Sequence, residues 1–86
     1  MLLKNAINNY RCGTWSFNLF DEEGIISWAP ERGRTHIHFG YNDIDKEPEM
    51  VGDYESLALA LNLFKIKDKP LTDYIEIIEV APLLDV

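Results

Sequence analysis

The sequence has little cysteine, few basic residues and no long apolar run. Cys12 is the single cysteine, so the chain cannot form an internal disulfide, which is typical of proteins in a reducing compartment. The longest unbroken apolar run, Leu57 to Leu61, is far shorter than the ~18 residues of a membrane span. Lys4 interrupts the opening residues, which therefore do not resemble a secretory signal peptide. We expect a cytoplasmic protein, in its own cell or in a host cell, without membrane contact.

Motifs that cradle phosphate or activate a nucleophile are missing as well. The sequence contains neither a Walker-type loop nor a G-x-G-x-x-G loop, and it lacks G-x-S-x-G and cysteine-protease patterns. Cys12 follows a predicted helix, where a cysteine usually acts as a small buried apolar residue. We therefore predict that the protein is not an enzyme and that it uses no cofactor.

The composition that remains is that of a small globular protein. The chain has 86 residues, 47% of them hydrophobic and 12% aromatic, which predicts a single domain over residues 1–86 with one modest core. The formal net charge is −7, and residues 41–86 carry all of it, with eleven acids against four lysines. Such a field repels nucleic acid and anionic membranes and attracts basic surfaces, so we expect no direct nucleic-acid binding.

The first half of the chain predicts a helix followed by a meander of three strands. Leu3, Ala6, Ile7 and Tyr10 recur with helical spacing, and Gly13 is placed to end that helix. Alternation of apolar and polar side chains then predicts strands over 14–20, 25–28 and 35–41, joined by turns over 21–24 and 29–34.

The second half predicts a polar connection and then helices. Residues 42–52 are the connection, and Asp53 is a suitable N-cap for a core helix running to about residue 65. The last segment, 72–80, is ambiguous because its periodicity favours a helix ended by Pro82, whereas its β-branched residues favour a fourth strand. The predicted fold class is α+β: an N-terminal helix, a three-stranded antiparallel meander, then a core helix and a C-terminal helix (or fourth strand) packed on one sheet face.

Acidic residues at alternate positions are the most distinctive feature of the sequence. In an extended chain, alternate side chains point the same way and lie roughly 6.6–6.8 Å apart, a spacing close to that of nucleic-acid phosphates. The run is therefore read in three ways: a solvated loop, a surface for a basic partner, or a metal site. A calcium-binding EF-hand is excluded because Pro48 and Tyr54 stand where that loop needs glycine and glutamate. The predicted partner-binding residues are Asp43, Asp45, Glu47, Glu49, Asp53 and Glu55, with Tyr41 and Tyr54.

Two histidines on a predicted strand provide a weaker candidate site. His36 and His38 are two residues apart, so both imidazoles project from one face of the sheet, where they could share a transition metal. A third ligand at a diagnostic spacing is missing. The alternative is that they are ordinary polar residues on the outer face of a one-sided sheet.

These observations favour a small acidic interaction module. The main hypothesis is an inhibitor or immunity-type protein that binds a basic surface of a partner, such as the nucleic-acid groove of a nucleic-acid-binding enzyme. The predicted order of elements resembles that of some phage-encoded anti-CRISPR proteins, a likeness of architecture alone, which implies an anti-defence role. The alternatives are a structural adaptor that homodimerises and a small metal-dependent enzyme that uses His36 and His38.

Overall fold

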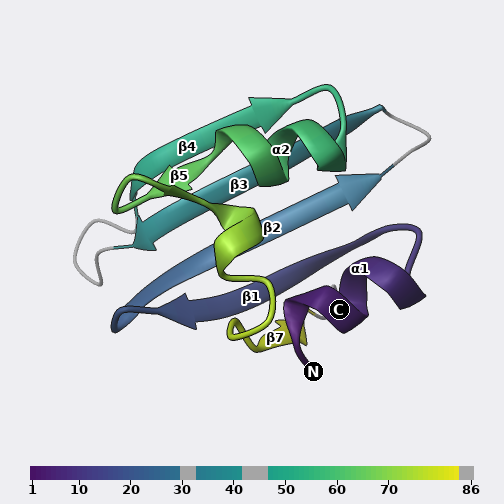
Figure 1. Cartoon of the computed structure of the whole chain (residues 1–86), viewed down its shortest axis with the longest axis horizontal. Helices are drawn as coiled ribbons and strands as arrows, with labels where there is room; N and C mark the ends of the chain where they lie inside the picture. Colours follow the sequence, from purple (N-terminus) through teal and green to yellow (C-terminus); the bar gives the residue numbers. More distant parts are fainter. Residues whose placement is uncertain (30–32, 42–46, 84–86) are drawn as a thin grey trace.

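A computed structural model describes residues 1–29, 33–41 and 47–83 of the chain (Figure 1). Within these ranges the elements follow one another as α1 (Leu3–Asn9), β1 (Gly13–Leu19), β2 (Glu22–Ala29), β3 (Arg34–Tyr41), β4 (Pro48–Tyr54), α2 (Leu57–Leu63), β5 (Lys65–Ile66), β6 (Lys69–Pro70), the 3-10 turn η1 (Leu71–Asp73) and β7 (Val80–Pro82). The α+β class is thus confirmed.

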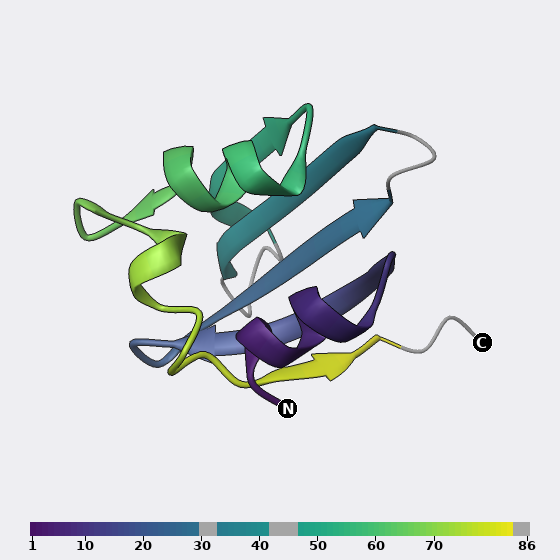
Figure 2. The same ribbon diagram turned by 45° about the vertical axis from the view of Figure 1, so that its right-hand side comes forward.

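The main sheet has five antiparallel strands in the order β4-β3-β2-β1-β7. β1 to β4 form a continuous meander, and β7 returns from the far end of the chain to pair with β1. Both helices lie on the same face of this sheet, α2 over β3 and β4 and α1 near β1 and β7 (Figures 1 and 2). In the described ranges no helix or strand covers the opposite face, which we call the open face.

Alternation along the strands sorts side chains between the two faces. On β1 the buried residues are Trp15, Phe17 and Leu19, and the register places Ile26 and Ile37 in the same layer. These side chains meet Leu3 and Ala6 of α1 and Ala60 of α2 in one apolar cluster. The two tryptophans belong to this core, because Trp15 and Trp28 are buried and their rings are stacked.

The largest error of the sequence prediction concerns residues 48–54. They form β4, whereas we expected a polar connection through residue 52 and a helix N-cap at Asp53. The cap is Ser56, whose hydroxyl accepts a hydrogen bond from the Leu59 N–H at 3.2 Å. The helix therefore begins at Leu57 and spans seven residues, because the chain up to Tyr54 is paired with β3.

The expected helix over 72–80 is also wrong. The segment holds a single 3-10 turn over Leu71–Asp73 and continues to β7, so the alternative of a further strand is correct for Val80–Pro82. The Tyr74 hydroxyl donates to the Ile66 carbonyl at 2.7 Å, which fixes the turn against the β5–β6 hairpin. The element order of helix, three strands and two helices is therefore not observed, and the architectural likeness to anti-CRISPR proteins loses its basis.

Three smaller expectations also change. The first hairpin turns at Phe20 and Asp21, both with positive φ (53° and 64°), so Gly24 lies within β2 rather than in the turn. The first helix ends at Asn9, and Gly13, with φ 152°, opens β1. Cys12 is exposed, because it lies in the bend between the two elements.

The N-terminal residues close the β7 side of the sheet. The Val80 N–H donates to the Met1 carbonyl at 2.7 Å, and the Leu3 N–H donates to the Ile78 carbonyl at 2.8 Å. Leu2 also forms an isolated bridge with Glu79. Among the described residues, no helix has the length and apolar character to cross a membrane.

Candidate functional site

The most distinctive surface follows the outer edge of β4. β4 is the last strand on its side of the sheet, and no described strand pairs with its outer edge. Alternate residues of this seven-residue strand therefore turn backbone N–H and C=O groups away from β3, which is the usual template for strand addition. The β7 side differs, since β7 has only three residues and the N-terminal residues cover its start.

Side chains of β4 differ between the two faces. Glu49, Val51 and Asp53 project to the open face, where the register sets Val51 beside His38 and Asp53 beside His36. The Glu49 side chain lies close to Gly40. A Cβ added at Gly40 would lie only 3.1 Å from the Glu49 Cβ. On the helix-covered face Gly52 is buried under Phe64, and Tyr54 packs against the core.

The predicted acidic surface is thus only partly brought together. Glu47 and Glu49 are exposed at the start of β4, and Glu55 is exposed just after it. Asp43 and Asp45 lie outside the described residues. Tyr54 is partly buried in the core cluster, and Tyr41 at the end of β3 is half-buried with its hydroxyl 2.8 Å from His38 Nδ1.

Asp53 is neutralised within the chain. The Arg34 Nε donates to Asp53 Oδ1 at 2.9 Å, and the His36 Nδ1 lies 3.5 Å from the same oxygen. The hydrogen bond from Arg34 holds the pKa of the Asp53 carboxyl below its ordinary value, and the positive charge acts in the same direction. Asp53 is therefore the one acid of β4 that we do not expect to attract a basic partner strongly.

This ion pair gives a pH-dependent prediction. Because folding lowers the Asp53 pKa, the pair's contribution to stability is fully present above the ordinary pKa of 3.8 and is lost as pH falls below it. We expect Asp53→Asn to lower the melting temperature slightly near pH 7 and to have no effect near about pH 2, because an exposed pair contributes little. Thermal unfolding followed by circular dichroism measures both. An equal difference at the two pH values would contradict this assignment, and Asp73→Asn is the matched control.

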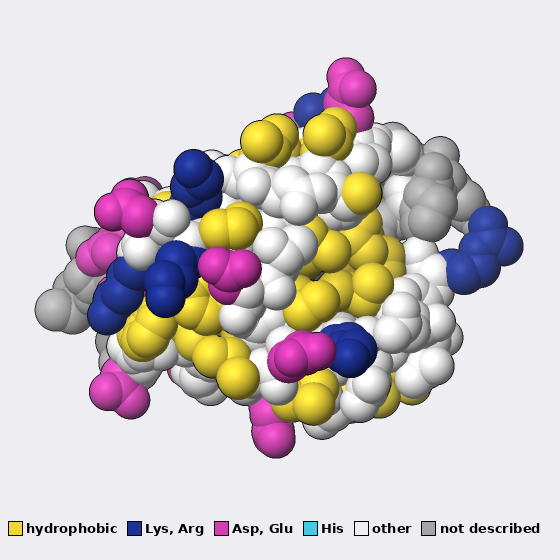
Figure 3. All heavy atoms as spheres, in the orientation of Figure 1, with side chains coloured by type: hydrophobic (Ala, Val, Ile, Leu, Met, Phe, Trp, Pro, Cys, Tyr) yellow, Lys and Arg dark blue, Asp and Glu magenta, His cyan; other side chains and the backbone are white. Residues whose placement is uncertain are grey.

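Apolar side chains of α2 lie above the β4 edge. All residues of this helix except Asn62 are alanine or leucine, and Leu59 and Leu63 are 43% and 57% exposed. Leu57 faces the space between the two helices, and at 100° per residue Leu59 and Leu63 fall on the opposite flank. That flank is the side of β4, because α2 packs over β3 and β4 and its C-cap Phe64 sits on Gly52. Figure 3 shows hydrophobic side chains gathered along α2 and between the helices, with charges scattered around them.

The histidines lie on the open face as expected. The register aligns Ser27, His36 and Asp53 across β2, β3 and β4, the residue types of a hydrolytic triad. The Ser27 hydroxyl instead accepts a hydrogen bond from the Thr14 hydroxyl at 3.4 Å, and in the described ranges no hydrogen bond joins it to His36. The His36 side chain is 54% exposed, so water reaches the row freely. This geometry neither activates the serine nor excludes water, which such catalysis requires.

A metal centre has equally little support on this face. His36 contacts Asp53, and His38 is paired with the Tyr41 hydroxyl, so the two imidazoles have separate partners. Among the residues that the structure describes, no group of three histidine, cysteine, aspartate or glutamate side chains is placed to hold a metal ion.

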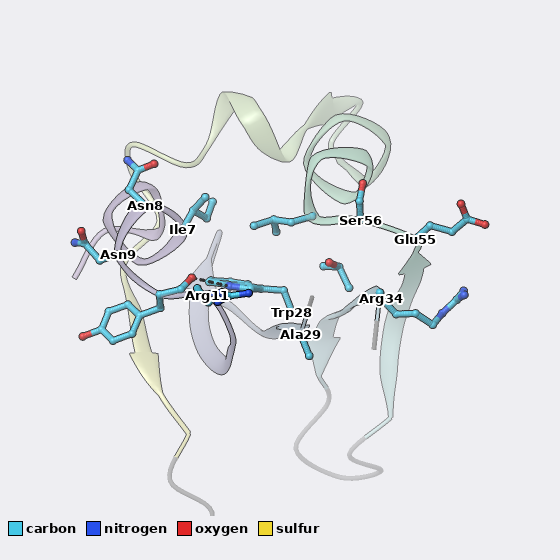
Figure 4. A pocket seen from close by; sticks show the side chains of 13 residues that line it. Ile7, Asn8, Asn9, Arg11, Trp28, Ala29, Arg34, Glu55 and Ser56 are labelled. Carbon is cyan, nitrogen blue, oxygen red and sulfur yellow. Dashed lines mark hydrogen bonds between the residues drawn. The ribbon is translucent and has the colours of Figure 1, made fainter. Parts of the chain in front are cut away.

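A groove of about 490 Å³ separates the two helices (Figure 4). Trp28 lies across its floor, with Ile7 and Asn8 of α1 on one side and Ser56 and Glu55 on the other. This volume is in the range of small-ligand sites, which are ~300–1,000 Å³. Its lining combines apolar side chains such as Ile7 and Trp28 with the amide of Asn8 and the charged side chains of Arg34 and Glu55. The sequence prediction missed it because its walls come from elements far apart in the chain.

Comparison with protein-family models, with curated proteins and with solved structures found no match for this chain.

Proposed function

We propose that this protein is an interaction module that binds a basic surface of a partner protein through the β4 edge. The observation that carries the proposal is an unpaired seven-residue strand edge with exposed acids at both ends, Glu47 and Glu49 before Val51 and Glu55 after it. A basic partner gains attraction from these acids, and the strand edge supplies hydrogen-bonding groups at the same place. An inhibitor that occupies the nucleic-acid-binding surface of an enzyme is the form of this function that we favour.

The same acids argue against self-association along this edge. In an antiparallel pairing of two copies centred on Val51, Glu47 of one copy would lie opposite Glu55 of the other. Like charges directly opposite each other destabilise paired strands. A different, basic partner is thus favoured over the homodimeric adaptor.

Neutralising the free acids tests the proposal. We expect Glu47→Gln/Glu49→Gln/Glu55→Gln to weaken binding of an octalysine peptide by about tenfold at low salt, since each exposed charge contributes modestly. The difference should disappear at high salt because added ions screen exposed charges. Titrations followed by NMR chemical shifts give both the affinity and the location on β4.

The matched control is Asp68→Asn/Asp73→Asn/Glu79→Gln, which changes the net charge equally at exposed sites outside β4. We expect this control to bind nearly as tightly as the unmodified protein. Equal losses in the two variants would mean that only the total charge matters, and the proposed surface would be wrong.

A further inference from the structure

We propose that the partner binds as an added β-strand, in which basic and apolar residues alternate. This inference rests on the proposed function and specifies the partner: an extended segment that pairs with the outer edge of β4. Its basic side chains would lie on the open face and its apolar side chains under α2.

The alternation follows from the two sides of β4. Successive side chains of a strand point to opposite faces, so an added strand continues the two faces of the sheet. On the open face the neighbours of this added strand are Glu49, Val51 and Asp53. Asp53 is paired with Arg34, whereas the Glu49 carboxylate forms no ion pair within the described part of the chain. Basic residues of the partner are complementary to that side.

The helix-covered side is apolar. Met50 projects to this face from β4 and is 37% exposed, and Leu59 and Leu63 are exposed on α2, which packs over β3 and β4. A helix that is apolar all round is normally buried, and α2 leaves these leucines uncovered. Every second side chain of an added strand would pack beneath them and remove this apolar surface from water.

The backbone of β4 suits this pairing. Its inner edge is paired with β3 from Thr35 to Tyr41, which holds the strand extended before a partner arrives. The partner alone must then be ordered, which lowers the entropic cost of binding. The strand begins at Pro48, which has no backbone N–H to donate. Pairing with a partner strand should therefore stop at this N-terminal end of β4.

Two peptides of equal composition test the inference. One alternates lysine and valine over about eight residues, and the other carries the lysines as one block and the valines as another. We expect the alternating peptide to bind about tenfold more tightly and to slow hydrogen exchange of the β4 amides. Every second N–H of an added strand faces β4. Two further peptides each carry one methylated backbone amide, one at a lysine and the other at a valine. Only one of these two residue types turns its N–H toward β4, so one methylated peptide should lose binding and the other should keep it.

The leucines of α2 provide the matched protein variants. Leu59→Asn/Leu63→Asn should weaken the alternating peptide several-fold, whereas Ile77→Asn, at an equally exposed apolar residue elsewhere, should leave it unchanged. If the two peptides bound with equal affinity, and if Glu47→Gln/Glu49→Gln/Glu55→Gln abolished the binding of both, strand addition would be wrong. The proposed function, binding of a basic partner, would still stand. Binding that ignores those glutamate substitutions, or no binding of either peptide, would overturn both.

Discussion

Trp28→Ala is expected to lower the free energy of unfolding by about 3–5 kcal/mol, the usual loss for a large aromatic side chain removed from a core. Trp28 is 3% exposed and its ring stacks on that of Trp15, with centroids 5.9 Å apart. Its Nε1 donates to the Tyr10 carbonyl at 3.1 Å, which ties the end of α1 to β2. The substitution removes both contacts at once. Urea unfolding followed by far-ultraviolet circular dichroism measures the change.

Trp28→Phe separates the two contributions of this side chain. Phenylalanine keeps an aromatic ring in the core but has no N–H, so this variant should lose less, with the hydrogen bond contributing about 1 kcal/mol. Hydrogen exchange of α1 should accelerate in both variants because the tie to Tyr10 is gone. A loss below about 1 kcal/mol for Trp28→Ala would show that the core closes around the gap, contrary to this account.

Gly24→Val is expected to destabilise the protein by about 1–3 kcal/mol or more, as is usual when a well-packed core receives extra atoms. A Cβ at Gly24 would lie 2.4 Å from the Phe17 Cζ, so that ring would have to move. Phe17 stacks on Phe39, with centroids 5.7 Å apart, and both are buried, so the movement would disturb two rings. Thermal and urea unfolding provide the measurement.

The neighbouring residue supplies the control. Glu23 is exposed on the open face of the same strand, and Glu23→Val inserts the same side chain at this exposed position. We expect this variant to keep its stability, since valine favours strands. If both valines destabilised the protein equally, the glycine would not be required for packing against Phe17.

Local patterns were sufficient for the first three strands and for α1. Trp15, Phe17 and Leu19 alternate with polar residues, and each turned out to be buried beneath the helices. β4 lacks such a pattern, because its open-face positions hold two acids and its helix-face positions include Pro48 and Gly52. Pairing with β3 makes this segment a strand, and pairing is a tertiary effect that overrides local propensity.

The helix prediction for the C-terminal segment, residues 72–80, failed for a related reason. Helical spacing of Leu71, Tyr74 and Ile78 was real, and all three are buried, yet they pack from a turn rather than from a helix. The β-branched residues indicated the strand only at Val80, which pairs with Phe17 of β1, whereas Ile75, Ile77 and Ile78 lie before β7. Helix and strand patterns overlap in short apolar segments, and only the sheet order resolves them.

The sequence predicted only part of the candidate site. The acids were recognised, but their meaning depends on β4 being the outermost strand, which no local pattern reports. The pairing of Asp53 with Arg34 was also hidden, since nineteen positions separate them and the register of β3 and β4 brings them together. The exposure of Leu59 and Leu63 on α2 was not visible in the sequence, because periodicity does not show where the sheet ends.

The unequal borders of the sheet have a consequence for stoichiometry. At one border the N-terminal residues cover the start of the short strand β7, and at the other no described strand pairs with the outer edge of β4. A chain with two receptive borders can propagate into filaments, whereas this arrangement offers one place of attachment. If a partner binds at that border as proposed, we expect a one-to-one complex.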